Sequence, residues 1–353
     1  MAKYKLGDIC EIVSGSTPKT GIDEYWDGNI KWITPAELND DTYIINDSVR
    51  KITELAVKKT GLSSFPKGTV ILSSRAPIGK VAIAGCEMYC NQGFKNFICS
   101  DKINSKYLYW FLKGNTAFLN SLGRGATFKE ISKGIVSEIE INVPNIEKQE
   151  DAVATLEKIS EIIALRKKEL IALDTLIKAR FVELFDGKYP EDTLLNLCNI
   201  IDYRGKTPEK VERGLPFITA KNVKMHHMTL EPREYISKET YDKVMVRGFP
   251  KEGDVVFTTE APLGNVCRIP HFDTEFYIGQ RIVTIQTDAL NPTYLEYALS
   301  DEEFVRKYMC KSSGSTVTGI RVRLLEQLTI PVPPRTLQDE FSIFVKQVEK
   351  SKF

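Results

Sequence analysis

The longest regular hydrophobic pattern lies in the middle of the chain. Residues 145–186 contain no Gly or Pro, and apolar residues recur at alternating spacings of three and four, which is typical of a heptad seam. Asn145 can cap a helix and Gly187 can end it. The pattern therefore predicts a helix of about forty residues, roughly 60 Å long. Arg166 and Arg180 occupy two slots of its seam, and the others are aliphatic: Leu156, Ile159, Ile163, Leu170, Leu173, Ile177 and Leu184.

A similar pattern returns near the end of the chain. Thr336 can cap a helix there, with Asp339 in its first turn. Phe341, Val345 and Val348 lie 189 positions after Ala152, Leu156 and Ile159, in the same heptad register. We expect a second helix over 334–353, about half as long as the first.

The segments that precede the two helices resemble each other. The best match pairs Gly68–Gly79 (GTVILSSRAPIG) with Gly253–Gly264 (GDVVFTTEAPLG), at an offset of 185 positions between Ala76 and Ala261. Seven shorter matches follow the same order, at offsets up to 190: Leu6–Cys10 with Leu194–Cys198, Thr17-Pro18 with Thr207-Pro208, Trp32–Ala36 with Phe217–Ala220, Gln92 with Gln280, Tyr107-Leu108 with Tyr294-Leu295, Gly125–Thr127 with Gly314–Thr316, and Val143-Pro144 with Val332-Pro333. Ordered self-similarity of this kind indicates a duplicated domain.

Each copy has the pattern of a mixed α and β domain. Thr69–Ser73 and Asp254–Thr258 combine β-branched residues with flanking Gly and Pro, as short strands do. Periodicity predicts helices over Asn104–Lys113 and Asn291–Leu299. The predicted fold class is α+β, with a first domain over 1–144, a long helix over 145–186, a second domain over 187–333 and a second helix over 334–353.

The amino-acid composition restricts the class of protein but does not indicate a function. The 353 residues include 42% apolar side chains, enough for two cores, and 48 basic residues against 47 acidic ones, so no net field draws the molecule to a polyanion. Any nucleic-acid binding must come from local patches or from partners. The seven cysteines include no CxxC pair, and no leader-like segment or apolar run of membrane-spanning length is present. These features favour a cytoplasmic protein with reduced thiols.

The layout of domain, long helix, related domain and related helix resembles the specificity (S) subunits of type I restriction-modification enzymes. The resemblance rests on the paired Gly68–Gly79 and Gly253–Gly264 segments, the Val-Pro followed by Gln149 or Gln338 at each helix entry, and the helix exit Lys178–Phe185 (KARFVELF). Together these motifs span nearly the whole chain.

The resemblance implies that each repeat is a target recognition domain for double-stranded DNA. It further implies that the two helices pack antiparallel as a coiled coil and hold the domains apart with pseudo-two-fold symmetry. Methyltransferase (M) subunits would methylate adenine with S-adenosylmethionine, and motor-nuclease (R) subunits would cleave with ATP and Mg. The chain itself would bind no cofactor or metal. A short second helix leaves three possibilities open: a truncated variant, pairing with a second copy, or cover by the M subunit.

Candidate DNA contacts fall into two groups. Side chains that can pair with guanine or adenine in the major groove are Arg75, Gln92, Lys95, Lys221, Gln280 and Arg281. A second group precedes the closing strand of each repeat and can meet phosphates or base edges: Arg124, Thr127 and Lys129, then Ser315, Thr316, Arg321 and Arg323. For each of these residues, ordinary polar surface is the alternative.

Other conspicuous residues point to structure rather than chemistry. His226 and His227 are adjacent, but His271 is the only further histidine, so we expect a surface or DNA-proximal loop and no metal site. Trp26, Trp32 and Trp110 are expected to anchor cores. The sequence contains no Walker A, GxGxxG, HExxH or GxSxG motif, and no Asn/Asp-Pro-Pro-aromatic tetrad of an amino-methyltransferase.

Two other functions compete with DNA recognition. A coiled-coil adaptor whose repeats bind protein or sugar would also explain the near-neutral charge. A self-contained methyltransferase or nuclease is disfavoured by the missing motifs. Strongly salt-dependent retention on duplex DNA would separate the DNA-binding protein from the adaptor.

Overall fold

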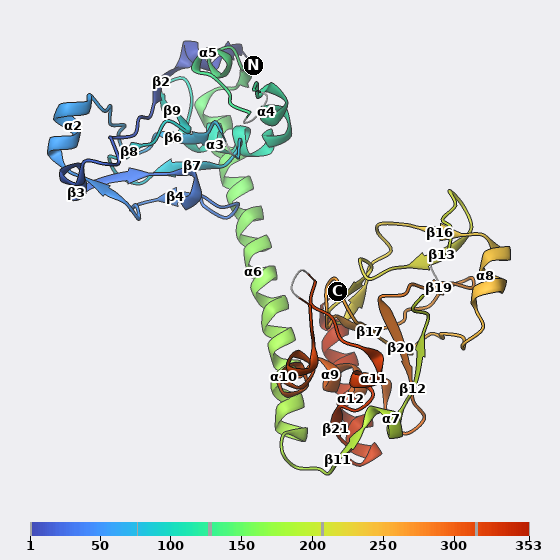
Figure 1. Ribbon diagram of the computed structural model, residues 1–353. Coiled ribbons are helices and arrows are strands. Elements are labelled where there is room, and N and C mark those ends of the chain that lie inside the picture. The colour runs from blue at the N-terminus through green and yellow to red at the C-terminus, as the bar shows by residue number, and fades with distance from the viewer. Residues whose placement is uncertain (1, 76, 126–128, 206–207, 315–316, 353) are drawn as a thin grey trace. The chain divides into compact units, whose positions relative to one another are not determined.

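The computed structural model describes the chain except residues 1, 76, 126–128, 206–207, 315–316 and 353. The chain divides into two compact units, residues 1–165 and 166–353 (Figure 1). The long helix α6 (Ile146–Phe185) contributes residues to both units, and its bounds fall within one residue of those predicted.

The first unit is built on a five-stranded sheet in the order β2-β9-β6-β7-β4. Its strands are β2 (Cys10–Ser14), β9 (Phe94–Cys99), β6 (Val70–Ser73), β7 (Val81–Ala84) and β4 (Ile44–Ile45). The first strand of the unit, β1 (Ala2–Lys5), pairs antiparallel with its last strand, β10 (Glu140–Val143). A smaller sheet has the order β5-β3-β8, made of β5 (Lys51–Ile52), β3 (Trp26–Ile33) and β8 (Tyr89–Cys90). The helices are α1 (Leu6–Ile9), α2 (Glu54–Thr60), α3 (Ser105–Gly114), α4 (Thr116–Leu122) and α5 (Lys133–Ser137), with 3-10 turns η1 (Asp23–Tyr25) and η2 (Pro35–Glu37).

The second unit repeats this arrangement. Its main sheet has the order β12-β20-β17-β18, made of β12 (Asn199–Asp202), β20 (Ile282–Gln286), β17 (Val255–Thr258) and β18 (Val266–Arg268). Beside it are β16-β13-β19 and the pairs β11-β21 and β14-β15. These strands are β16 (Tyr235–Ile236), β13 (Leu215–Ile218), β19 (Tyr277–Ile278), β11 (Glu191–Thr193), β21 (Thr329–Pro331), β14 (Val223–Lys224) and β15 (His227–Met228). The helices are α7 (Leu194–Leu197), α8 (Lys238–Val244), α9 (Pro292–Ser300), α10 (Glu302–Lys311), α11 (Val322–Leu325) and α12 (Arg335–Ser351).

Four strands of each main sheet have the same order and the same antiparallel pairing in the two units. β2-β9-β6-β7 corresponds to β12-β20-β17-β18, and every neighbouring pair in both sets is antiparallel. In the smaller sheets β3 pairs parallel with β8, and β13 pairs parallel with β19. The repeat seen in the sequence is therefore a repeat of the fold, and the predicted α+β class is confirmed.

A buried glutamine joins each repeat to the helix that follows it. Gln149 Oε1 accepts from the backbone N–H of Asn104 at 2.8 Å, and its amide donates to the carbonyl of Pro144 at 2.9 Å. Gln338 makes the same contacts with Asn291 N (2.8 Å) and Pro333 O (2.8 Å). Because a buried amide without partners costs about 1–3 kcal/mol, these contacts fix the start of each helix.

A second contact holds α6 to the first unit. Glu157 accepts hydrogen bonds from Lys106 Nζ at 2.9 Å and from the hydroxyl of Tyr43. The Lys106 bond is the main reason that the pKa of the Glu157 carboxyl lies below its ordinary value, with Tyr43 adding to the effect.

The predicted seam of α6 is covered only in part. Leu173, Ile177 and Leu184 pack into the core of the second unit, where α12 lies antiparallel to α6: Arg166 bonds Ser351 O and Arg180 pairs with Glu340. Phe181 and Phe185, which lie outside the predicted seam, are also buried there. Their rings contact α9 as well as α12, through Tyr294 and Phe341. Packing on a globular domain widens the apolar stripe beyond the two positions per heptad of a coiled coil. Leu170 is half-buried, and Leu156, Ile159 and Ile163 are exposed.

The three tryptophans lie in the first unit, as the core anchors that were expected. Trp26 and Trp32 are buried and meet edge to face with ring centroids 5.1 Å apart, and the Arg50 guanidinium lies 3.6 Å over the Trp26 ring. Trp110 is half-buried and packs against the larger hydrophobic core of the first unit. Across the described part of the chain, no helix combines the length and apolar character needed to cross a membrane.

Candidate nucleic-acid interface

The best-matched sequence segment forms the same loop in both units. In the loop between β6 and β7, the Ser73 hydroxyl accepts from Lys80 N at 2.9 Å, and Gly79 N donates to Ser73 O at 3.0 Å. Between β17 and β18, Thr258 makes the equivalent bonds with Asn265 N (2.8 Å) and Gly264 N (2.9 Å). The side-chain hydroxyl at this position therefore closes the loop in both units.

The glycine that ends each of these loops cannot be replaced freely. Gly79 and Gly264 have φ angles of +100° and +92°, which side chains rarely adopt. A Cβ at Gly79 would come within 2.6 Å of Thr116 Cγ2, and one at Gly264 within 2.8 Å of the Tyr308 ring. The loops are therefore held close to α4 and α10.

A second loop lies beside the first in each unit. Arg124 and Glu130 exchange backbone hydrogen bonds of 3.0 and 2.9 Å, and Ile131 N bonds Ser74 O at 2.9 Å. In the second unit Ser313 and Gly319 exchange bonds of 3.0 and 3.1 Å, and Ile320 N bonds Thr259 O at 3.0 Å. The loops that carry Arg75 and Arg124, far apart in sequence, are thus brought to one edge of the first unit, and the equivalent loops lie together in the second unit.

In the first unit the charges gather around Glu130. Its carboxylate lies 3.3 Å from Lys95 Nζ and 3.9 Å from Arg75 Nη1. The Lys95 side chain is only 7% exposed and also donates to Ser74 Oγ at 3.2 Å. Lys95 is therefore too deep to touch a base and instead holds Glu130. Arg124 and Lys129 are exposed and make no ion pair with any residue that the structure describes.

The second unit has a corresponding but different set of charges. Arg281 Nε lies 2.9 Å from Glu260 Oε1, and both side chains are exposed. Arg204, which the sequence did not single out, donates from Nη2 to Thr259 Oγ1 at 3.1 Å. A signal for it exists, since Gly205–Pro208 repeats the Gly-x-Thr-Pro of Gly15–Pro18. Arg321 and Arg323 are exposed next to this edge.

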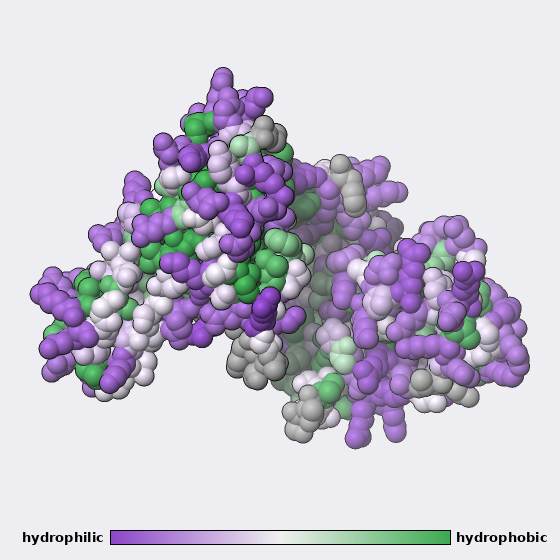
Figure 2. All heavy atoms as spheres, turned by 90° about the horizontal axis from the view of Figure 1, so that it is seen from above, coloured by the Kyte–Doolittle hydropathy of each residue, from purple (hydrophilic) through white to green (hydrophobic). Residues whose placement is uncertain are grey.

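Of the remaining candidate DNA contacts, none of those with described positions is tied to these two loops by a hydrogen bond. Gln92 is exposed and accepts from the Thr17 hydroxyl, Gln280 is half-buried, and Lys221 is exposed. Thr127, Ser315 and Thr316 lie outside the described residues. Figure 2 shows polar side chains over most of the visible surface, with scattered apolar patches, so hydropathy alone does not mark an interface.

The adjacent histidines have separate environments. His227 is exposed, whereas the His226 ring stacks on Tyr297 and its Nδ1 lies 3.0 Å from Glu296 Oε1. The buried Glu296 also accepts from Arg268 Nε at 2.6 Å. No cluster of three metal-ligating side chains occurs among the residues for which positions are given.

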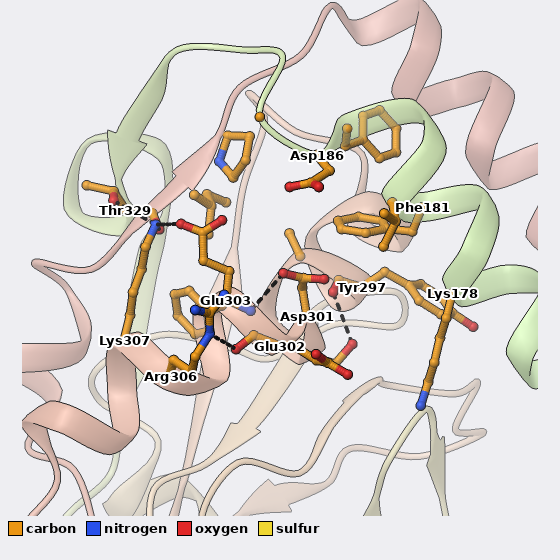
Figure 3. A pocket seen from close by; sticks show the side chains of 18 residues that line it. Lys178, Phe181, Asp186, Tyr297, Asp301, Glu302, Glu303, Arg306, Lys307 and Thr329 are labelled. Carbon is orange, nitrogen blue, oxygen red and sulfur yellow. Dashed lines mark hydrogen bonds and ion pairs between the residues drawn. The ribbon is translucent and has the colours of Figure 1, made fainter.

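A cavity of about 370 Å³ in the second unit lies away from this edge, between the end of α6, α9, α10 and β21 (Figure 3). Phe181 and Tyr297 line it, with Asp186 and Asp301 among its carboxylates. Lys307 at its rim is already paired with Glu191 at 2.8 Å and Glu303 at 3.2 Å. Its charges are mixed and partly paired with one another, which is typical of a packing crevice between elements rather than of a ligand site.

Comparison with known proteins decides what these domains are. The family model for the type I restriction modification DNA specificity domain matches residues 1–175 and 192–353. The chain belongs to this family. The MjaIX specificity subunit of Methanocaldococcus jannaschii is 31% identical over 97% of this chain and 85% of its own length. The EcoprrI specificity subunit of Escherichia coli is 22% identical over 93% of this chain and 82% of its own length. The prediction of a DNA specificity subunit, a recognition component rather than an enzyme, is confirmed.

Solved structures show the same fold. The S subunit from M. genitalium aligns with a TM-score of 0.57 and 15% identity, over 99% of this chain and 90% of that one. A chain from a study of assembly and conformational transition of the type I R-M system aligns with a TM-score of 0.58 and 19% identity over the same shares.

Proposed function

We propose that this specificity subunit reads a bipartite DNA target, one half-site with each repeat. The supporting observation is that the same pair of loops recurs at one edge of both units, with exposed cations on each. Arg124 and Lys129 in the first unit, and Arg321 and Arg323 in the second, are assigned to phosphates. Base edges are assigned to Arg75, Gln92, Lys221, Gln280 and Arg281, with Thr127, Ser315 and Thr316 as further contacts from the closing loops.

Two domains are needed on energetic grounds. A good bidentate base contact discriminates by about 1–3 kcal/mol, whereas useful specificity over random DNA needs about 4–10 kcal/mol. One small domain that reads a few base pairs reaches only the lower end of that range. When a second domain is tethered by α6, its binding becomes an intramolecular step at high effective concentration.

The chemistry is assigned to partners in the cytosol. M subunits would supply S-adenosylmethionine and methylate adenine, and R subunits would supply ATP- and Mg-dependent cleavage. Three seam residues of α6, Leu156, Ile159 and Ile163, are exposed on one face of the helix and support a protein partner there, because an apolar stripe of this kind is usually covered. The other exposed large apolar residues of α6 lie around the helix: Ile146, Ile162, Leu165, Ile171, Leu176 and Val182.

Replacing Lys129 with Ala tests the DNA-facing edge. Lys129 is exposed and unpaired among the described residues, so its loss removes one phosphate contact and one released counterion. With the M partner present, affinity for a duplex carrying the target should fall, and the log–log slope against salt should become shallower by about 1.

Lys67→Ala is the matched control for this measurement. Lys67 is equally exposed but precedes β6, at the end of the strand opposite Ser74. It should leave the slope unchanged. If the two variants have equal slopes, Lys129 does not contact a DNA phosphate. If the affinity of the parent complex for DNA does not depend on salt, the result favours an adaptor over a DNA-binding protein.

A further inference from the structure

The two repeats differ at one equivalent place in the proposed interface. Ser74 and Thr259 each receive a hydrogen bond from the closing loop, so the next residues, Arg75 and Glu260, occupy the same loop position. Each of these residues forms a backbone bridge to the closing loop, Arg75 to Glu130 and Glu260 to Gly319. One loop position therefore carries a cation in the first unit and a carboxylate in the second.

The residue that pairs with this loop position also comes from a different part of the chain in each unit. In the first unit Glu130, on the closing loop, faces Arg75 with 3.9 Å between the charged atoms. In the second unit the closing loop has Gly319 at that place. The cation Arg281 comes instead from the residue before β20, where its carbonyl accepts from Thr259 N at 2.9 Å. Its equivalent in the first unit is Gly93, whose carbonyl accepts from Ser74 N at 2.7 Å. Each unit thus keeps one arginine–glutamate pair on a shared scaffold but builds it from different positions.

In the second unit, the contact between Arg281 and Glu260 leaves the guanidinium group of Arg281 accessible to a ligand. Glu260 approaches Nε, the guanidinium nitrogen nearest the backbone, at 2.9 Å. The two terminal nitrogens of Arg281 make no hydrogen bond to a residue that the structure describes, and the side chain is 53% exposed. A guanidinium held from its inner edge, with both outer nitrogens open, matches the N7 and O6 acceptors of guanine in the major groove.

We propose that Arg281 reads a guanine in the second half-site, that Glu260 is the residue that positions it, and that Arg75 and Glu130 are the corresponding pair for the first half-site. This inference rests on the proposed function. Keeping the scaffold while relocating the charged pair lets one fold read two different sequences.

The experiment maps methylated sequences by single-molecule sequencing in cells that express each variant with the unmodified M partner. Arg281→Gln should abolish the preference for guanine at one position of one half-site, a loss of about five- to hundred-fold. The gap and the other half-site should stay unchanged. Arg75→Gln should act on the other half-site alone.

Glu260→Gln separates positioning from folding. It should weaken the preference for the same base as Arg281→Gln does, but to a smaller extent. The double variant should show no weaker preference than Arg281→Gln alone, because both changes act through one contact. Arg335→Gln is the matched control: Arg335 forms an Nε–carboxylate pair of 3.0 Å with Asp339 on α12, and its loss should leave the motif unaltered.

Three results would overturn the inference: a second half-site without guanine on either strand, relaxation in both half-sites from Arg281→Gln, or a motif unchanged by Arg281→Gln. If the parent chain yields no bipartite motif at all, the proposed function fails instead, so the two failures are distinguishable.

Discussion

Deleting Ile159–Leu165 from α6 should shorten the gap between the two half-sites by about three base pairs and leave both half-sites unchanged. Seven residues of helix span about 10 Å, and a base pair rises about 3.4 Å along the DNA axis. The deletion removes one whole heptad, so the helix turns by only about 20° relative to its original phase. Every side chain in the segment is exposed, so no core is lost. The readout is the methylated motif of cells that express the variant with its M partner.

Duplicating Ile159–Leu165 provides the matched control. It disturbs the helix to the same extent in the opposite direction, so the gap should lengthen by about the same amount. If both variants methylate the parent sequence with the parent gap, α6 does not set the spacing.

Phe341→Ala should cost the second unit about 3–5 kcal/mol of unfolding free energy. Phe341 is fully buried on α12 and lies 5.5 Å from the Phe181 ring, 5.6 Å from Phe185 and 5.4 Å from Tyr297. All three tryptophans belong to the first unit. Urea unfolding should therefore show a circular dichroism transition that moves to lower urea and a tryptophan fluorescence transition that does not.

Ile343→Ala on the same helix is the comparison. Ile343 is 60% exposed, and surface substitutions usually change stability by no more than about 0.5 kcal/mol. A large loss from Ile343→Ala, or none from Phe341→Ala, would contradict the packing of α12 against α6.

Some features could be predicted from the sequence because one local signal fixes them. The bounds of α6 follow from Asn145, Gly187 and the absence of Gly and Pro between them, and Ile146–Phe185 confirms them. The strands predicted at Thr69–Ser73 and Asp254–Thr258 are observed as β6 and β17. The duplication could be detected because its matches keep one order along the chain.

Other features depend on tertiary packing, which periodicity does not encode. Lys95 looks like a surface cation in the sequence, but its side chain is buried, with the Glu130 carboxylate and the Ser74 hydroxyl as its partners. Phe181 falls outside the heptad seam and is buried because α9 and α12 both pack on that side of α6. The pair Arg281–Glu260 joins residues 21 positions apart that only the β17–β20 pairing brings together.

The most direct test of two-domain recognition is to map methylated adenines genome-wide in a cell that expresses this chain with its M partner. The predicted result is a single split motif, two short half-sites separated by a gap of constant length. Methylation of one uninterrupted sequence, or of half-sites at variable separation, would contradict recognition by two tethered repeats.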